Sequence, residues 1–436
     1  RLLMTDLAQW AADRGVKFFL CNFTDLFGVQ RAKLVPAEAI AGAQEGGAGF
    51  AGFAAWLDMT PADPDMLVMP DAETAIQLPW KPELAWVAGD PWMDGKPVAQ
   101  APRNVLKSLV QKAADQGFVL KSGVEPEFHL IDADGTDISD NRDSQEKPCY
   151  DQSALMRRYD VIAEICSAMI QLGWKPYQND HEDANGQFEI NWDFGPCLET
   201  ADRHAFFKFM VKEIAEKHGF RATFMPKPFS HLTGNGCHVH HSLWTADGQT
   251  CVFDGDDEMG LSEIAYHFLG GLMAHGQAVC AITNPTVNSY KRINAPATLS
   301  GATWSPQSVT YGGNNRTHMV RIPDGGRLEL RLADGAANPY LLQAVLLAAG
   351  LDGLERQLDP GKRLDVDMYS EGHKIRGAKT LPLNMLDALR DFEKDKRLTA
   401  ALGTEFSRAY LKLRMREWTQ YCQHLTQWER DTTLDC

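Results

Sequence analysis

The stretch Gly123-Val-Glu-Pro-Glu-Phe-His-Leu130 alternates between polar and apolar side chains. As a β-strand it places Glu125, Glu127 and His129 on one face, because successive side chains of a strand point to opposite faces. Two carboxylates on one face repel each other, and a hard divalent cation is a common partner that keeps both ionised. The alternative is the solvated outer face of an edge strand, where Pro126 is tolerated. Matching groups on other strands must decide between the two interpretations.

The bulk composition excludes several classes of partner. The chain has 436 residues and a net charge of −15, so it lacks the basic surface that nucleic acid requires. No apolar run approaches the ~20 residues that a membrane span needs. The first residues lack a signal-peptide pattern, and a start at Arg1 predicts that the natural start lies upstream. Nine scattered cysteines without a Cys-x-x-Cys pair predict reduced thiols and a cytoplasmic location.

The length predicts two or three domains, and we expect a boundary near residue 102. Residues 1–102 are expected to form a small α/β domain, with a helix at 5–14 and strands at 16–23 and 30–35. The stretch Gly46-Gly-Ala-Gly-Phe-Ala-Gly52 contains G-x-G-x-x-G but does not open a helix in a βαβ unit. It is therefore expected to be a flexible loop rather than a dinucleotide site. The proline-rich residues 61–102 are expected to form short strands, turns and a linker.

Residues 103–436 are expected to form a second, larger domain in which amphipathic helices alternate with strands. A polar loop at 135–149 is predicted to be mobile. The expected helices lie at 103–117, 151–173, 202–218, 261–282, 338–358, 383–394 and 404–428. The strands between them carry unusual polar faces.

Three further segments supply groups that match the opening carboxylates. The strand at 186–191 and the loop before it contribute Glu189 and Glu182. The strand at 237–243 places His238, His240 and Ser242 on one face. Each acid taken alone is most simply interpreted as a surface acid. For the strand at 237–243, the simplest interpretation is one buried histidine beside solvated ones.

The stretch Arg327-Leu-Glu-Leu-Arg-Leu332 is expected to bury its leucines on one face and to place Arg327, Glu329 and Arg331 on the other. That polar face could be a structural salt-bridge ladder, or it could bind a metal and anions. Five carboxylates and His238 suffice for two cations with open positions, which suits Mg²⁺ or Mn²⁺. Metals and arginines without a phosphate-binding loop are typical of phosphoryl transfer by electrostatic stabilisation.

Along essentially its whole length the sequence resembles the glutamine synthetase superfamily, with motifs in the order of that family. The motifs are Val124-Glu-Pro-Glu-Phe128, His181-Glu182, Gly186-Gln-Phe-Glu189, Thr223-Phe-Met-Pro-Lys-Pro228, Gly236-Cys-His-Val-His240, Asn284-Pro-Thr-Val-Asn-Ser-Tyr-Lys-Arg292, Asn315-Arg316, Arg321-Ile-Pro323, Arg327-Leu-Glu-Leu-Arg331 and Ala336-Ala-Asn-Pro-Tyr340. The resemblance implies an α+β fold with an N-terminal β-grasp domain (1–102) and a catalytic domain (103–436) built on an antiparallel half-barrel with helices. It also implies a dodecamer of two hexameric rings, with each site between neighbouring subunits.

The resemblance also assigns roles by position. It implies one cation held by Glu127, Glu182 and Glu189, and a second held by Glu125, His238 and Glu329. It implies that L-glutamate and its activated γ-carboxyl are bound by Arg292, Arg316 and Arg331. ATP is expected to face His240, Ser242, Arg321 and Arg327. The implied chemistry is ATP-driven formation of γ-glutamyl phosphate followed by attack of an amine.

The amine site departs from the ammonia-using members of the family. Those members carry an Asp-Gly-Ser-Ser stretch where this chain has Phe50-Ala-Gly-Phe-Ala54, and a flap glutamate where residues 293–323 contain no acid. An ammonium ion needs acceptors and a nearby negative charge, whereas a methyl group prefers an apolar wall. Phe53 and Trp304 are candidates for that wall. The pattern resembles the glutamate–methylamine ligase (γ-glutamylmethylamide synthetase) branch, with a small alkylamine as acceptor.

Three alternatives remain open at this stage. A γ-glutamylpolyamine synthetase would need acids to hold a distal ammonium group, and the flap has none. An ammonia-using glutamine synthetase would need acids from another chain. A non-catalytic structural relative would be expected to lack metal ligands, and all six positions are present.

Overall fold

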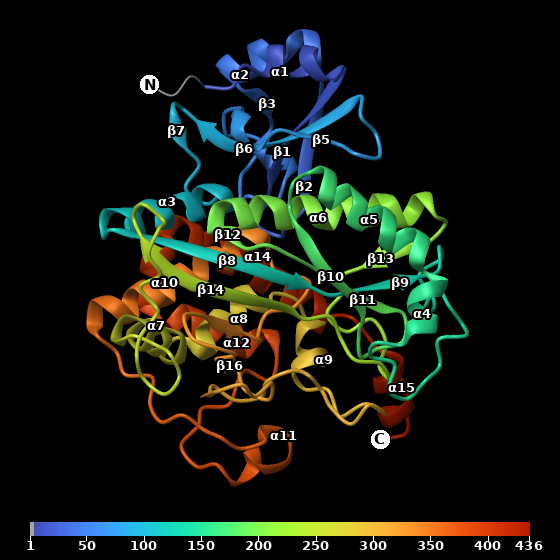
Figure 1. Ribbon diagram of the computed structural model, residues 1–436, viewed down its shortest axis with the longest axis vertical. Helices are drawn as coiled ribbons and strands as arrows, with labels where there is room; N and C mark the ends of the chain where they lie inside the picture. The colour runs from blue at the N-terminus through green and yellow to red at the C-terminus, as the bar shows by residue number, and fades with distance from the viewer. Residues whose placement is uncertain (1–3) are drawn as a thin grey trace.

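The computed structural model describes residues 4–436, and its first sheet contains only elements from the N-terminal part of the chain (Figure 1). Strand β1 pairs antiparallel with β2 and parallel with β6, and the sheet order is β2-β1-β6-β4-β3, with β5 and β7 also paired to β6. The strands are β1 (Phe18–Thr24), β2 (Gln30–Pro36), β3 (Ala48–Phe50), β4 (Met66–Pro70), β5 (Ile76–Gln77), β6 (Leu84–Met93) and β7 (Lys96–Pro97). Helices α1 (Leu7–Arg14) and α2 (Ile40–Gly46) share a small apolar core with β1 and β6.

Two expectations for this region were wrong in detail. The glycine-rich stretch 46–52 is not simply a loop, because it contains β3, which pairs with β4. The proline-rich residues 61–102 include the ten-residue strand β6, which joins both halves of the sheet. The helix α1 begins at Leu7 rather than at the predicted residue 5, because the Asp6 side chain caps it by accepting from the Ala8 and Gln9 backbone amides.

The rest of the chain is built on two further sheets. A six-stranded sheet has the order β12-β8-β14-β17-β16-β15, and all of its pairs are antiparallel except β15 with β16. A four-stranded antiparallel sheet has the order β10-β11-β9-β13. Their strands are β8 (Phe118–Pro126), β9 (Phe128–Ile131), β10 (Pro176–His181), β11 (Gln187–Trp192), β12 (Gly195–Pro196), β13 (Arg221–Thr223), β14 (Cys237–Thr245), β15 (Tyr311–Gly312), β16 (Val320–Arg321) and β17 (Leu328–Leu330).

The opening stretch divides between these two sheets, so the prediction of one continuous strand was wrong. Strand β8 ends at Pro126, which has no amide hydrogen to extend the ladder. The Glu127 amide donates to the Gly236 carbonyl at 3.1 Å, and β9 then enters the other sheet. His129 consequently does not share a site with the carboxylates. It is fully buried, and its Nδ1 lies 2.9 Å from the Asn235 side-chain oxygen.

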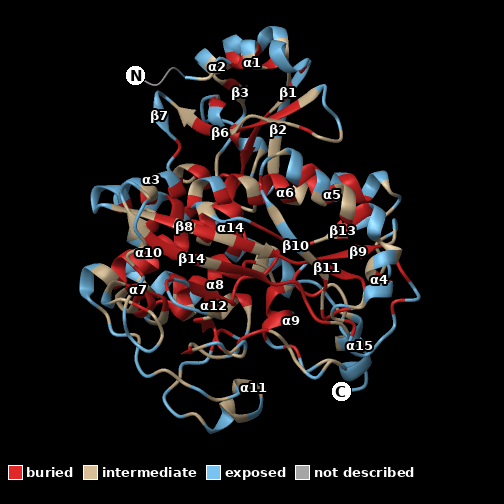
Figure 2. Cartoon of the chain, in the orientation of Figure 1, coloured by how far each residue is buried: buried red, intermediate tan, exposed pale blue. Residues whose placement is uncertain are grey.

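Helices cover the outer side of these sheets and contain most of the buried side chains (Figures 1 and 2). Helices α3 and α6 pack on β8, and α10 packs on α3, α6 and α7. The helices are α3 (Pro102–Asp115), α4 (Gln152–Arg157), α5 (Tyr159–Gln171), α6 (Cys197–Lys217), α7 (Glu263–Ala274), α8 (Gly276–Thr283), α9 (Ser289–Ile293), α10 (Pro339–Arg356), α11 (Met368–Glu371), α12 (Met385–Lys394), α13 (Lys396–Leu402), α14 (Thr404–Cys422) and α15 (Gln427–Thr433). The mixed α+β class is therefore confirmed.

Several single helices predicted from periodicity are pairs of helices. Residues 151–173 form α4 and α5, residues 261–282 form α7 and α8, and residues 404–428 lie in α14 and the start of α15. The polar loop at 135–149 is anchored, because the buried Asp143 accepts from the Gly186 amide at 2.7 Å and lies 2.6 Å from His181 Nε2. Within residues 4–436, no helix combines the length and apolar character that a membrane span needs.

Candidate active site

A cavity of about 830 Å³ lies beside β8, β14 and β17 and extends to the loop between β10 and β11. Its wall contains thirteen of the fifteen sequence-predicted site residues, from several separate segments of the chain. They are Glu125, Glu127, Glu182, Glu189, His238, His240, Ser242, Trp304, Arg316, Arg321, Arg327, Glu329 and Arg331. Antiparallel pairing of β14 with both β8 and β17 brings these polar faces together.

The first cluster of carboxylates consists of Glu127, Glu182 and Glu189. Each offers an oxygen within 4.8 Å of the other two. Burial raises the pKa of Glu127 to about 7, against the opposing effects of the Gly236 amide and nearby arginines. Burial, reinforced by the neighbouring carboxylates, also raises the pKa of Glu182 and of Glu189 well above the ordinary value. A divalent cation at this position would compensate the mutual repulsion and allow all three groups to ionise.

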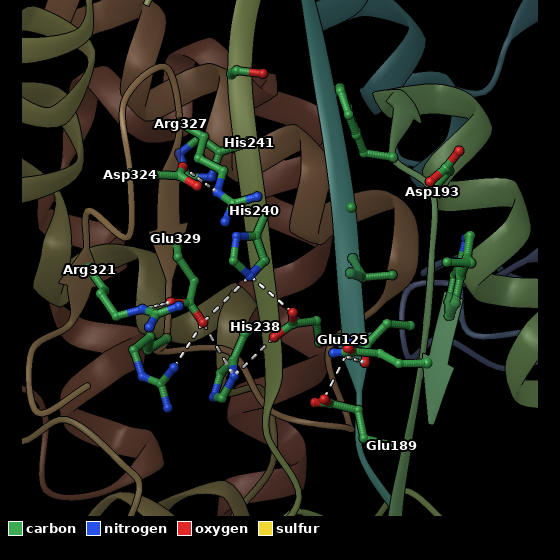
Figure 3. A pocket seen from close by; sticks show the side chains of 18 of the residues that line it. Glu125, Glu189, Asp193, His238, His240, His241, Arg321, Asp324, Arg327 and Glu329 are labelled. Atoms are coloured by element: carbon green, nitrogen blue, oxygen red, sulfur yellow. Dashed lines mark hydrogen bonds and ion pairs between the residues drawn. The ribbon is translucent and has the colours of Figure 1, made fainter. Parts of the chain in front are cut away.

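The second cluster joins Glu125 of β8 with two histidines of β14 and Glu329 of β17 (Figure 3). His238 Nδ1 lies 3.6 Å from an oxygen of Glu125 and 3.6 Å from one of Glu329. His240 Nε2 lies 3.0 Å from Glu125 and 3.7 Å from Glu329. The cluster therefore contains His240 as well as the predicted His238, and it meets the first cluster because Glu125, Glu189 and His238 also converge within 4.8 Å.

The charge state of this second cluster suits a metal. Burial lowers the pKa of His238 to about 4, so its imidazole is neutral at pH 7 and can coordinate. Burial opposes ionisation of Glu125, but hydrogen bonds and charge from the two histidines outweigh it and lower the pKa of that carboxyl. Glu329 is likewise ionised, because the arginines and histidines around it overcome its burial and lower its pKa to about 2.

The predicted arginines occupy different depths. Arg331 Nη1 donates to Glu329 at 2.8 Å, and Arg321 Nε donates to the other Glu329 oxygen at 2.5 Å. Arg316 is exposed at the cavity wall. Arg292 does not line the cavity but lies buried beneath it, where its Nη1 donates to the Leu332 carbonyl at 2.9 Å. These residues surround the acids with a set of fixed positive charges.

The far end of the cavity contains aromatic residues that sequence reasoning missed. Phe194 and Trp244 pair there with ring centroids 6.4 Å apart, and Lys121 Nζ lies 4.0 Å from the Trp244 ring centroid. The Trp244 indole donates to the predicted residue Ser242 at 2.8 Å. Arg327 pairs with Asp324 at 3.0 Å near the same end. No sequence motif distinguishes these aromatic residues from core residues, which is why only the fold reveals them.

The two residues predicted to form the amine wall lie apart. Trp304 lines the cavity, has a left-handed backbone with φ of 57°, and buries an indole N–H that has no hydrogen-bond partner. Phe53 is 56% exposed on the short 3₁₀ turn Gly52–Ala54 and does not line this cavity. Within one chain, the structure brings only Trp304 to the site.

The family follows from a comparison with known proteins. The model of the family "Glutamine synthetase, catalytic domain" matches residues 99–433. The chain belongs to the glutamine synthetase family. As a member of that family it is an ATP-dependent ligase of the glutamate–amine class.

Relatives of this glutamine synthetase family member carry two different names. A protein named glutamine synthetase from Rhizobium leguminosarum bv. phaseoli is 66% identical over 432 residues, which cover 99% of each chain. A glutamate–methylamine ligase from Methyloversatilis universalis is 41% identical over 441 aligned positions, again covering 99% of each chain. A solved structure described as a GmaS/ADP complex is 65% identical and superimposes with a TM-score of 0.97, covering 99% of this chain and 100% of that one.

Glutamine synthetase family enzymes use ATP and divalent metals, and the two clusters fit such ions. The donors are carboxylate oxygens with one or two neutral imidazoles, which is a hard ligand set suited to Mg²⁺ or Mn²⁺. His238 turns Nδ1 toward the carboxylates, while its Nε2 is buried without a partner. The carboxylates of the first cluster have no basic side chain paired with them at ion-pair distance in the described residues 4–436, so their charge is left for a cation.

Proposed function

We propose that this protein joins a small amine, methylamine, to the γ-carboxyl of L-glutamate at the expense of ATP. The observation that carries the amine assignment is the composition of the cavity wall. It contains Trp304 from residues 293–323, a segment without a single acid. An apolar ring there buries the methyl group of methylamine, a contribution that ammonia cannot make.

Two divalent cations are proposed at the two clusters. Glu127, Glu182 and Glu189 would hold one, and Glu125, His238 and Glu329 the other, with His240 as an additional neighbour of the second. When bound, such cations neutralise phosphate charge and polarise the transferring phosphoryl group. Because Glu329 is already paired with Arg321 and Arg331, it can contribute only part of its charge to a cation.

The nucleotide is proposed to extend from the second cluster toward Phe194 and Trp244. These rings offer a stacking surface for a purine, and Lys121 adds a positive charge beside them. Ser242, His240, Arg321 and Arg327 line the same cavity and would contact the phosphates and ribose. The solved GmaS/ADP complex, which is 65% identical, supports a nucleotide in this fold.

Glutamate is proposed to lie at the other side of the clusters, held by Arg316 and Arg331. Arg292 would act from below by fixing the backbone carbonyls of Arg331 and Leu332, to which it donates. The γ-carboxylate attacks the terminal phosphorus of ATP, giving γ-glutamyl phosphate and ADP. The amine nitrogen then attacks the acyl carbon, phosphate leaves, and the nitrogen loses a proton.

The names of the relatives support two acceptors, ammonia and methylamine. Ammonia would be favoured if a second copy of the chain placed acids at the amine wall. The corresponding stretch Phe50-Ala-Gly-Phe-Ala54 has none, and its Phe53 is exposed and free to reach a neighbouring site. A polyamine would lack a partner for its distal ammonium, and a non-catalytic role fits poorly with six retained metal-ligand positions.

The amine wall is proposed to be completed by Phe53 from a second copy of the chain, in an assembly of twelve copies arranged as two rings of six. Multi-angle light scattering tests this directly, and a monomer would contradict it. We also propose a domain boundary near residue 102. A cytoplasmic location is proposed separately, since all nine cysteines are free thiols.

One assay tests the proposed function. Phosphate release is measured with ATP, Mg²⁺ and L-glutamate plus ammonium, methylamine, ethylamine or putrescine. We expect kcat/KM to be highest for methylamine. A kcat/KM for ammonium well above that for methylamine would identify an ammonia-using glutamine synthetase, and no amine-dependent release would refute ligation altogether.

A further inference from the structure

Asp183 is a buried carboxylate that follows the cluster residue Glu182 but does not line the cavity. It is 9% exposed, and hydroxyl groups satisfy it. Its Oδ2 accepts from Thr233 Oγ1 at 2.7 Å and from Ser300 Oγ at 2.5 Å. The Cys149 thiol donates to the other oxygen at 3.7 Å. Three segments that are distant in sequence therefore converge on one carboxylate.

Ser300 belongs to a surface segment, residues 296–304, in which no side chain is fully buried. Within it, residues 298–302 form a turn in which the Thr298 amide donates to the Ala302 carbonyl at 3.2 Å. Leu299, at the tip, is 75% exposed. The side-chain hydrogen bonds from this turn to the body of the protein end on Asp183 and on Thr233, whose Oγ1 lies 3.4 Å from Thr298 Oγ1. The turn thus depends on polar anchors rather than on apolar burial.

Trp304 lies four residues after Ser300 and lines the cavity. Its left-handed backbone, φ 57°, is unfavourable for a bulky side chain and persists only where the surrounding structure holds it. The anchors on the N-terminal side of Trp304 are those of the turn 298–302. The hydrogen bonds to Asp183 therefore help to fix the ring at the cavity wall.

We propose that Asp183 is a positioning residue that latches residues 296–304 over the amine end of the site through Ser300 and Thr233. This inference rests on the proposed function. Asp183 itself contacts no substrate and acts through Trp304. By holding the segment closed, the latch keeps bulk water from the acyl phosphate while leaving room for a small amine.

The latch matters because γ-glutamyl phosphate can react with water as well as with an amine. In that side reaction water oxygen attacks the acyl carbon, the bond to the phosphate oxygen breaks, and glutamate and inorganic phosphate form. One ATP is then consumed without an amide. Water exclusion is a general function of closing segments in active sites, and here the number of amides formed per ADP measures it.

The decisive variant is Ser300→Ala, because it removes a latch hydrogen bond from the segment side without touching the metal-binding loop. Leu299→Ala is the matched control in the same turn, since Leu299 makes no side-chain hydrogen bond. Hydrogen–deuterium exchange of the full-length, ligand-free protein is followed in peptides covering residues 296–305. We expect Ser300→Ala to exchange about three- to tenfold faster, as loss of one hydrogen bond predicts, and Leu299→Ala to match wild type.

The second readout is the coupling of ATP consumption to amide formation, measured as the number of amides formed per ADP released. Wild type is expected to form about one amide per ADP, and Ser300→Ala to release at least twofold more ADP than amide, a ratio that a merely structural defect would leave unchanged. Asp183→Asn retains the shape and one acceptor oxygen, so its coupling should lie between wild type and Asp183→Ala.

The two readouts separate the possible failures. Unchanged exchange in Ser300→Ala would overturn the latch. Faster exchange with unchanged coupling would overturn its role in excluding water. If wild type forms no amide with any amine, the proposed function fails, and the exchange experiment alone still decides whether Asp183 holds the segment.

Discussion

Glu125 of β8 and His240 of the adjacent strand β14 are in contact, with His240 Nε2 3.0 Å from a carboxylate oxygen of Glu125. The register that pairs His238 with Glu125 on adjacent strands brings both histidines against this acid. Glu125 also converges with Glu189 and His238, so it lies between the two carboxylate clusters. The proposed site for two neighbouring cations therefore depends on the pairing of β8 with β14.

Added Mg²⁺ should stabilise the protein most at alkaline pH. Burial raises the pKa of Glu127 from 4.5 to about 7. Protonated Glu127 contributes its full share to the free energy of unfolding below pH 4.5, the pKa of this carboxyl in the unfolded chain. That contribution is lost as pH rises through about 7, the folded-state pKa, because the unfolded chain binds fewer protons than the folded one over this range. Differential scanning fluorimetry should show a larger Mg²⁺-induced rise in Tm at pH 8 than at pH 5. Glu127→Gln should reduce that rise, and the exposed Glu216→Gln should not; equal effects would refute the first cation site.

Glu329→Gln should lower kcat/KM by roughly 10²–10³-fold, the scale seen when one preorganised electrostatic group is removed from an active site. The change removes a proposed cation ligand and leaves the charges of Arg321 and Arg331 without their shared partner. Steady-state phosphate release measures it. Glu258→Gln is the control. The Glu258 side chain is 86% exposed, and its ion pair to Arg363, at 3.8 Å, lies on the surface. Wild-type turnover of Glu329→Gln would undo the assignment.

Trp304→Ala should reduce the proposed preference for methylamine over ammonium. A buried methyl group contributes about 0.8 kcal/mol, which corresponds to roughly a fourfold change in kcat/KM. We therefore expect the ratio of kcat/KM for methylamine over ammonium to fall about fourfold. Competition between the two amines, with products quantified by mass spectrometry, gives this ratio directly. If kcat/KM instead falls by the same factor for methylamine and for ammonium, the ring has a structural role and does not select the amine.

His275 should make stability depend on pH at a point remote from the cavity. Its Nε2 lies 2.6 Å from Asp352, and its Nδ1 contacts Asp395. Burial disfavours the imidazolium, but these two carboxylates overcome the effect and raise the pKa of His275 above 6.5. The stabilisation is therefore complete below pH 6.5 and is lost as pH rises through the folded-state pKa.

The corresponding variant is His275→Gln, which should be less stable than wild type by about 3 kcal/mol at pH 6, the scale of breaking a buried ion pair. The difference in Tm between the two proteins should shrink at pH 9. The exposed His373→Gln provides the control. A difference that stays constant from pH 6 to pH 9 would show that the imidazole does not titrate in this range and would contradict the predicted pH dependence.

Much of the site could be predicted because polar alternation in short strands survives folding. Glu329 and Arg331 were expected on the face of their strand opposite the leucines, and they line the cavity whereas Leu328 and Leu330 do not. The same reasoning failed for His129, because Pro126 ends one ladder and the chain continues in another sheet. The two-residue alternation of polar and apolar side chains cannot reveal that the chain passes from one sheet to another, since both segments remain extended.

The sequence by itself determined the metal-type donor set, the absence of acids in residues 293–323 and the family motifs, because these are properties of residue type and order. Only the tertiary structure decided which groups meet. It brought His240 into the second cluster, left Phe53 outside the cavity of its own chain, and joined Asp183 to Ser300 across 117 residues. Such contacts arise from strand register and loop packing, which depend on the whole core rather than on any local stretch.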